Sequence, residues 1–197
     1  MKLFASVALL AFSSCMSVPS SQSATAGSTQ AASHEHQIKL YLGQRSLDED
    51  DWAPVEDQVA FQLEYSHESP ADAVGWEVGI GGSADDDTID IGFGPQDVTV
   101  ATGEIYGGVR KSFGSGNVRP YVGGGLSFIN LDAEVDSASE DDSSLGLYLH
   151  GGVEFLLGQS FALGLDLRTL LGSEITLAGF DTDADYLQLA LTVGWGF

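Results

Sequence analysis

The chemically most versatile residues of this sequence are its four histidines and its single cysteine. His34 and His36 flank Glu35, and imidazole together with carboxylate could bind a transition metal weakly. This motif ends a Ser/Ala/Thr-rich stretch with no other ligand nearby, so we predict no metal site there. His67 and Ser69 have a spacing that could serve a Ser–His–acid hydrolase, but they fall in a predicted turn. We therefore predict no catalytic residues from these motifs.

A second group of ionisable residues is spaced regularly along alternating stretches. His150 and Glu154 lie four residues apart, and Asp166 and Arg168 lie two apart, so each pair shares one face of an extended strand. For His150 and Glu154 we expect a hydrogen bond inside a closed fold, because buried charges need partners. The predicted interior ion network consists of Lys39, Arg45, Glu64, Glu77, Glu104, Arg110, His150, Glu154, Asp166 and Arg168.

Strands position these ions, because apolar residues recur at every second position after about residue 36. Most of the alternating segments hold nine or more residues, which is the length of a tilted membrane-spanning strand. An even number of antiparallel strands can close on itself and remove its edges. The fold prediction for residues 36–197 is all-β, an eight-stranded antiparallel up-and-down transmembrane β-barrel. Its predicted strands are 37–45, 58–65, 74–82, 98–113, 119–130, 145–157, 161–169 and 187–197.

The connections between these segments alternate in length and in charge. Three links are short, at 66–73, 114–118 and 158–160, and the other four are long. Most of the 29 acidic residues fall in the long links, 46–57, 83–97, 131–144 and 170–185. Short periplasmic turns and longer outside loops are typical of bacterial outer-membrane barrels. The sequence thus predicts four acidic extracellular loops, at which divalent cations could bind loosely through oxygen ligands.

The polar faces indicate which side of the barrel meets lipid. A soluble lipocalin-like barrel would carry many Lys and Glu residues outside. Here the polar faces hold mostly Gly, Ala, Ser, Thr, Gln and Tyr with a few charges of both signs, which suits the narrow interior of eight strands. The net charge of -22 also excludes a nucleic-acid partner, since there is no basic patch to neutralise phosphates.

The N-terminus is predicted to be a targeting segment. Lys2 precedes the apolar run 3–12, which indicates a secretory signal peptide over residues 1–14. Cys15 follows this run and is the candidate lipidation site, although ordinary cleavage near 24–26 is an alternative. Residues 15–35 are rich in Ser, Ala and Thr and are predicted to form a flexible tether.

Residues 106–128, YGGVRKSFGSGNVRPYVGGGLSF, resemble a hairpin of the outer membrane protein A-like and opacity-type porin barrels. The C-terminal strand is similar to the ending of these proteins, with apolar residues alternating up to a final Phe. The resemblance implies that the barrel-assembly machinery reads Phe197, Trp195 and Val193 during insertion. It also implies residence in the bacterial outer membrane, in contact with its lipid and lipopolysaccharide.

These observations favour a non-enzymatic surface protein, a monomer without a cofactor, whose role is structural or is to interact through its loops. Two other functions stay open. One is a lipid A-modifying enzyme of the deacylase type, to which His67 and Ser69 would belong. The other is a narrow pore, although eight strands leave little room inside.

Overall fold

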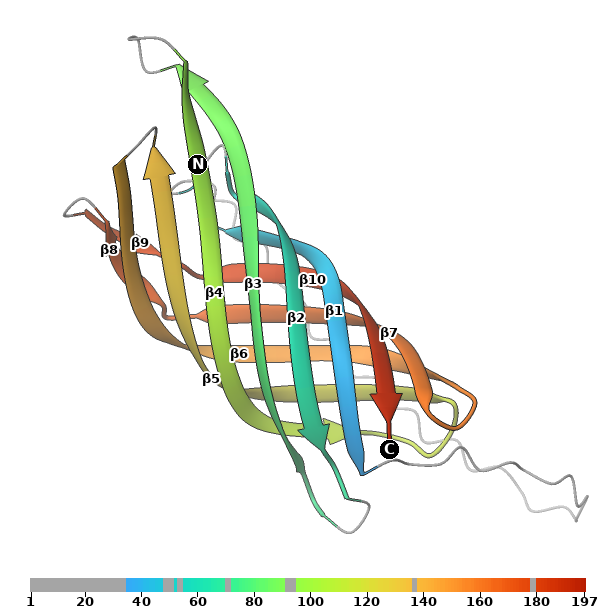
Figure 1. The fold of residues 1–197 in the computed structure, drawn as a ribbon. Coiled ribbons are helices and arrows are strands. Elements are labelled where there is room, and N and C mark those ends of the chain that lie inside the picture. The colour runs from blue at the N-terminus through green and yellow to red at the C-terminus, as the bar shows by residue number, and fades with distance from the viewer. Residues whose placement is uncertain are drawn as a thin grey trace, which may run out of the picture.

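The computed structural model describes residues 35–47, 52, 55–69, 72–90, 95–135, 138–177 and 180–197. Its strands form one closed antiparallel barrel and a separate two-stranded hairpin (Figure 1). The predicted eight-stranded antiparallel barrel is thereby confirmed. The barrel strands are β1 (His36–Leu47), β2 (Asp57–His67), β3 (Gly75–Asp90), β4 (Pro95–Ser112), β5 (Val118–Val135), β6 (Ala138–Leu157), β7 (Phe161–Leu171) and β10 (Tyr186–Gly196). Within the described ranges, no helix has the length and apolar character needed to cross a membrane.

The first and last strands close the barrel. β1 pairs with β10 in antiparallel register from Gln37 opposite Gly196 to Leu47 opposite Tyr186. One residue beyond β10, the Phe197 amide still donates to the His36 carbonyl at 3.0 Å. The last residue of the chain therefore takes part in closing the barrel, and the chain end lies beside the start of β1 (Figure 1).

Alternation of side chains separates the two faces of the wall. Along β10, buried and exposed residues alternate without a break. The outward positions carry large apolar side chains such as Leu191, which is 66% exposed, and Phe61, which is 56% exposed. Polar, charged, small and tyrosine residues occupy most of the inward positions in the middle of the barrel. Because open sheet edges and exposed charges are costly in hydrocarbon, a closed barrel with an apolar exterior suits a lipid environment.

Three strands, β3, β5 and β6, are much longer than their predicted segments, and β4 begins three residues earlier than predicted. β3, β4, β5 and β6 hold 16 to 20 residues, whereas β1, β2, β7 and β10 hold 11 or 12. The extra residues come from the stretches 83–97 and 131–144, which were predicted to be loops but are largely paired strand. Polar and acidic residues in the extra part of β3 hid its strand, whereas on β5 the apolar residues shift to inward positions. Ile129 and Leu131 point inward, whereas Phe128 still points outward.

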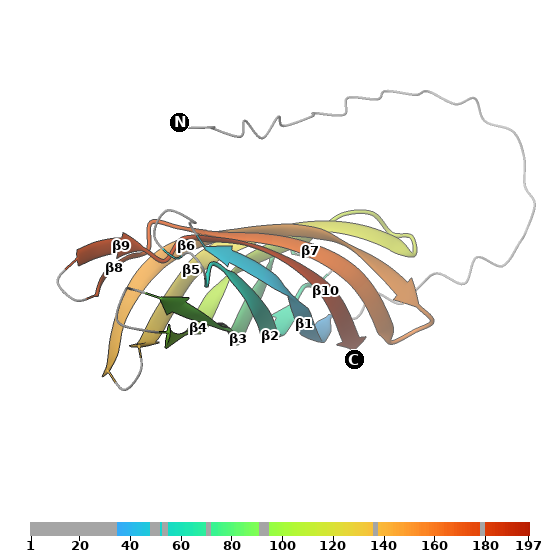
Figure 2. The ribbon, with the colours of Figure 1, turned by 90° about the horizontal axis from the view of Figure 1, so that it is seen from above.

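A small hairpin lies within the predicted link 170–185. β8 (Glu174–Leu177) pairs with β9 (Phe180–Asp183) outside the barrel sheet. Asp142 joins this hairpin to β6, because its Oδ2 accepts a hydrogen bond from the Thr176 amide at 2.7 Å. Figure 2 shows the hairpin at the same end of the barrel as the extended parts of β5 and β6.

Candidate functional site

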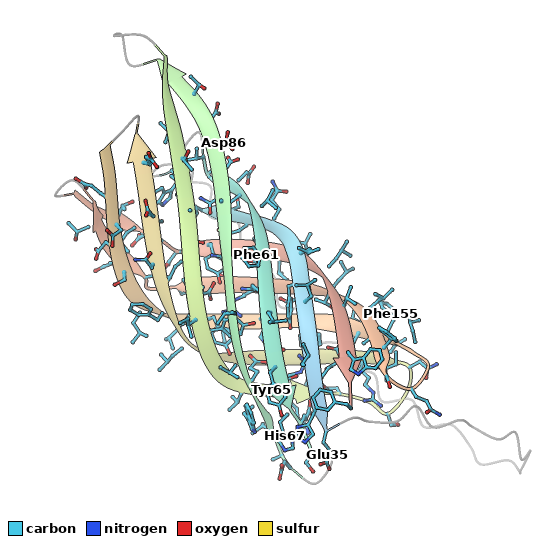
Figure 3. All side chains as sticks on the ribbon, viewed as in Figure 1. Glu35, Phe61, Tyr65, His67, Asp86 and Phe155 are labelled. Carbon is cyan, nitrogen blue, oxygen red and sulfur yellow. The ribbon has the colours of Figure 1, made fainter. Side chains whose placement is uncertain are left out.

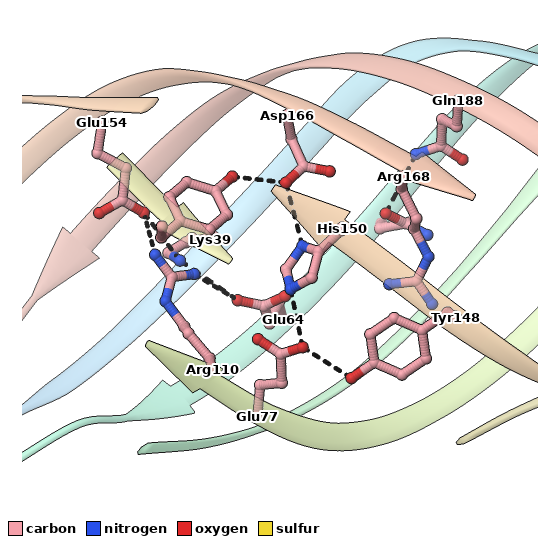
Figure 4. A network of polar contacts seen from close by, with 12 residues as sticks. Lys39, Glu64, Glu77, Arg110, Tyr148, His150, Glu154, Asp166, Arg168 and Gln188 are labelled. Carbon is pink, nitrogen blue, oxygen red and sulfur yellow. Dashed lines mark hydrogen bonds and ion pairs between the residues drawn. The ribbon is translucent and has the colours of Figure 1, made fainter. Parts of the chain in front are cut away.

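The barrel interior contains all ten residues of the predicted ion network, each buried. They reach the interior because each occupies an inward position of its strand. They fall into two groups. We call Arg45, Glu104 and Arg168 the arginine cluster. The histidine cluster, shown in Figure 4, consists of Lys39, Glu64, Glu77, Arg110, His150, Glu154 and Asp166.

Glu104 is the centre of the arginine cluster. Its two carboxylate oxygens contact Arg168 Nη2 at 2.6 Å and Arg45 Nη2 at 2.8 Å. Two hydroxyls also donate to Glu104, from Tyr186 and Ser127, each at 2.7 Å. One carboxylate thus holds two guanidinium groups, which leaves this cluster with one surplus positive charge.

Glu154 and Glu64 organise one side of the histidine cluster. Glu154 Oε1 lies 2.8 Å from both Lys39 Nζ and Arg110 Nη2. The same two cations approach Glu64 Oε1 at 3.3 Å and 3.4 Å. These four residues come from β1, β2, β4 and β6, so their contacts span the barrel interior.

His150 organises the other side of this cluster. Its Nδ1 lies 3.1 Å from Asp166 Oδ2, and its Nε2 lies 2.9 Å from Glu77 Oε1. Tyr148 donates to the same Glu77 oxygen at 2.7 Å. The expected hydrogen bond between His150 and Glu154 is wrong, since each contacts other residues. Four residues along a strand span about 13 Å, too far for a direct contact.

Aromatic rings fill the space around these charges. The Arg45 guanidinium lies 3.7 Å from the centre of the Tyr186 ring, and Arg168 lies 3.9 Å from that of Tyr106. Such stacking favours cations in a dry interior. Glycine on neighbouring strands makes room for the rings: a Cβ atom at Gly79 would run into the Tyr106 ring. The sequence pattern placed tyrosines on the inward faces, but it did not predict which arginine each ring would stack on.

An apolar plug closes the interior at the end formed by the long strands. Trp52 and Val55 from the link after β1 pack there, and the Trp52 indole donates to the Asp183 carbonyl at 2.8 Å. This plug was not predicted from the sequence, although an isolated Trp in an acidic stretch was a usable signal. The plug residues are Leu47, Trp52, Val55, Val100, Ile129, Leu131, Leu170, Ile175 and Ala184.

The opposite end of the interior is open. A cavity of about 310 Å³ lies at the end that contains the chain terminus. It reaches Arg110 and Glu154 of the histidine cluster, and its outer wall includes Glu35, Glu68 and Lys111. The interior is therefore accessible from this end and sealed at the other.

Aromatic residues surround the outside of the open end. The His36 ring lies 4.7 Å from that of His67 and stacks on Phe197 at 5.8 Å. His67 also packs against Trp76, whereas the Ser69 hydroxyl donates to Glu35 at 3.3 Å. A Ser–His–acid relay needs the serine to donate to the histidine. Figure 3 shows His67 and Glu35 at this end of the barrel, far from Asp86.

The remaining predicted site residues divide into two groups. Phe197, Trp195 and Val193 face outward and are 58%, 48% and 47% exposed. Cys15 and His34 lie outside the described residues, as do the predicted signal peptide and most of the tether.

Comparison with known proteins gives one family and several similar folds. Residues 8–197 match the family described as outer membrane protein beta-barrel domain. No curated protein matches the chain significantly.

Three solved structures illustrate the shared fold. Neisserial surface protein A is 13% identical with a TM-score of 0.59, and covers 82% of this chain and 96% of its own. Ail is the attachment invasion locus protein of Yersinia pestis, and its structure was solved with the heparin analogue sucrose octasulfate. It is 17% identical with a TM-score of 0.57, and the match covers 84% of this chain and 100% of Ail. A major outer membrane protein from Thermus thermophilus is 15% identical with a TM-score of 0.55, covering 84% and 100%. At such identities the likeness shows the fold alone.

Proposed function

Because the chain belongs to the outer membrane protein beta-barrel domain family, we propose that it is a non-enzymatic surface protein of the bacterial outer membrane. In this proposal the barrel is an anchor, and its function is to present an acidic surface to the outside. The role is structural or consists of binding a partner at that surface.

The observation that carries the proposal is a group of acidic side chains at the plugged end, which we call the acidic crown. Asp86 lies at this end, opposite Glu35 and His67 (Figure 3). Outer-membrane barrels have short periplasmic turns and longer external segments, so the long strands are expected to face outside. The crown consists of Asp85, Asp86, Asp87, Asp132, Glu134, Glu140, Asp141, Asp142 and Glu174.

The filled interior supports an anchoring role over a pore. Glu104 holds Arg45 and Arg168 across the interior, and the apolar plug lies beyond them. Water and ions would have to cross both layers. Eight strands are just wide enough for side chains to fill the interior, which agrees with this arrangement.

The charge of the crown selects its partner. Ail was solved with a heparin analogue, a polyanion, whereas the crown would repel one. We therefore propose a cationic partner, with divalent cations that bridge to lipopolysaccharide phosphates as a second possibility. The chain would act as a monomer after insertion by the barrel-assembly machinery, and lipidation of Cys15 would add a second anchor.

Binding to a cationic polymer tests this proposal. Wild-type barrel in lipid vesicles should bind fluorescent polylysine in a salt-dependent way, and should not bind heparin. Neutralising five crown acids together should weaken polylysine binding by at least tenfold; the substitutions are D85N, D86N, D87N, E140Q and D141N. A control variant that removes three charges at the open end, E35Q/E68Q/D72N, should bind like wild type, and the crown triple D85N/D86N/D87N, which removes the same number, should bind more weakly. Equal binding by the two triple variants would overturn the crown as the interaction surface.

Lipid A composition tests the enzymatic alternative separately. Mass spectrometry of lipid A from cells with and without the protein should give identical acyl patterns. An acyl chain that is lost with wild type and kept with S69A would show a deacylase instead.

A further inference from the structure

The histidine cluster carries more negative charge than its fixed cations balance. Its four carboxylates belong to Glu64, Glu77, Glu154 and Asp166, whereas only Lys39 and Arg110 are permanent cations. All six side chains are buried, and uncompensated charge is costly in such a place. One proton on His150 would leave the cluster with one excess negative charge, which the surplus positive charge of the arginine cluster offsets from the neighbouring layer. A divalent cation bound to neutral His150 would instead neutralise the histidine cluster itself.

The ligands for such a cation already converge. Glu64, Glu77 and His150 each offer one ligand atom, and these atoms lie within 4.8 Å of one another. Figure 4 shows the three side chains pointing toward one another from three strands. Two carboxylates and one imidazole are a ligand set that suits zinc and related transition ions.

The contact between His150 and Glu77 has the spacing of two neighbouring metal ligands. Nε2 and Oε1 lie 2.9 Å apart, but they do not have the alignment of a hydrogen bond. Two ligands that bind zinc tetrahedrally at about 2.0–2.1 Å are themselves about 3.3 Å apart. Only a small outward movement would therefore admit the ion. Glu77 Oε2 is also buried without a hydrogen-bond partner, which leaves it free to coordinate.

The surroundings of His150 match those of a metal-binding histidine. Its Nδ1 lies 3.1 Å from Asp166 Oδ2, so an Nδ1–H donor there leaves a lone pair on Nε2 facing Glu77. Metal-ligating histidines usually donate their other ring N–H to such a carboxylate. Tyr148 orients Glu77 in the same way, by donating to Oε1 at 2.7 Å.

We propose that the barrel interior binds one divalent transition-metal ion, with Zn²⁺ as the best fit, through His150, Glu77 and Glu64. Asp166 and Tyr148 are positioning residues for this site. The ion enters during folding or through the cavity at the open end, which reaches Arg110 and Glu154 beside Glu64. The plug keeps the site closed from the opposite side.

Metal retention by the refolded barrel tests this proposal. Full-length wild type is refolded in detergent with Zn²⁺ or Co²⁺, washed with a chelator, and analysed for metal content. We expect wild type to keep one ion per chain, with Co²⁺ absorption bands typical of nitrogen and oxygen ligands. H150Q and E77Q should lose the ion, and D166N should weaken binding by about 10–100-fold.

The surface histidines provide the matched control. His36 and His67 lie side by side on the outside of the open end and could bind metal adventitiously. H36Q/H67Q should keep the ion, and heat-modifiable gel migration should show that every variant is folded. Should H150Q and E77Q fail to fold, X-ray absorption of Zn²⁺-loaded wild type should still show one nitrogen among oxygen ligands. Retention that depends on His36 and His67, or no retention by wild type, would overturn the proposal.

Discussion

At the scale of single residues, Glu104 has the greatest influence on the interior. It accepts from two guanidinium groups and two hydroxyls, all within 2.8 Å. A buried ion pair contributes little net stability by comparison with an apolar core, but the removal of one partner leaves the other uncompensated. The importance of Glu104 therefore comes from the two arginines that would be left without it.

The substitution E104Q tests this point. Glutamine keeps the shape of the side chain but removes the carboxylate that contacts both Arg45 and Arg168. We expect the free energy of unfolding to fall by about 3–5 kcal/mol. Denaturant titration in detergent micelles, followed by tryptophan fluorescence, measures it. E174Q, at an exposed crown position, should have almost no effect; an equally small effect of E104Q would contradict the argument.

Outside the membrane-spanning part, Asp142 is a second carboxylate that accepts two hydrogen bonds. Backbone hydrogen bonds from Thr176 and Ser143 lower the pKa of Asp142 below its usual 3.8. A lowered pKa means that the charged form supports the contact between β6 and the β8–β9 hairpin above about pH 4. That support is lost as the pH falls through the lowered pKa.

Nuclear magnetic resonance can follow this contact directly. The Thr176 amide signal should titrate with an apparent pKa below 3.8, and D142N should shift it at neutral pH to the position seen in acid. A Thr176 signal that does not change between pH 5 and pH 2 would show that the contact is not made in solution.

At the scale of elements, the end of β10 combines closure with recognition. The Phe197 amide bonds to His36 and its ring stacks on the His36 ring, while Trp195 packs against Phe161. These contacts are few, so losing the Phe197 side chain should cost the folded barrel little. The assembly machinery, in contrast, is expected to read that side chain in the unfolded protein.

Phe197→Ala separates the two roles. We expect refolding into detergent to be nearly normal, because the backbone bond to His36 remains. In cells, the amount of heat-modifiable barrel in the outer membrane should fall several-fold. L191A, at an equally outward position in the same strand, is the control. Equal losses in both assays would show that Phe197 acts only through folding.

The strands were predictable from the sequence because a two-residue period marks a strand with one apolar and one polar face. Which residues would be ionic partners was not predictable. His150 meets Asp166 and Glu77 through strand register and barrel curvature, and neither leaves a local pattern. The plug was hidden for a different reason. Toward the end of β5, apolar residues occupy inward positions, as Ile129 and Leu131 do, so the apolar period no longer marks the outer face.

At the scale of the whole molecule, two layers close the interior in series. The arginine cluster spans the interior, and the apolar plug lies at the outer end. An ion would have to separate buried ion pairs and then cross a dry layer, and each step is costly. Either layer alone should therefore be enough to prevent conduction.

Planar-bilayer recordings should show no steady conductance for wild type. Two double variants each remove one layer: I129A/L131A opens the plug, and R45S/R168S opens the arginine cluster. Each should show no conductance while folded. Only the combination of all four substitutions should conduct. Steady conductance of wild type would restore the pore as a function.

The unequal strand lengths have a consequence for the reach of electrostatic forces. On β5, the outward apolar residues end at Phe128, and Glu134 follows six residues later. At about 3.3 Å per residue and a tilt near 45°, this places Glu134 about 14 Å above the last lipid-facing ring. Electrostatic potential at physiological salt decays over about 8 Å. The phosphates themselves lie about 5–7 Å beyond the hydrocarbon, so Glu134 stands about one decay length outside them. Their repulsion of the outermost acids, and the attraction of those acids for a cation held among the phosphates, are therefore reduced about threefold by screening. The long strands thus favour a soluble cationic partner that approaches from the medium over one that lies in the membrane surface.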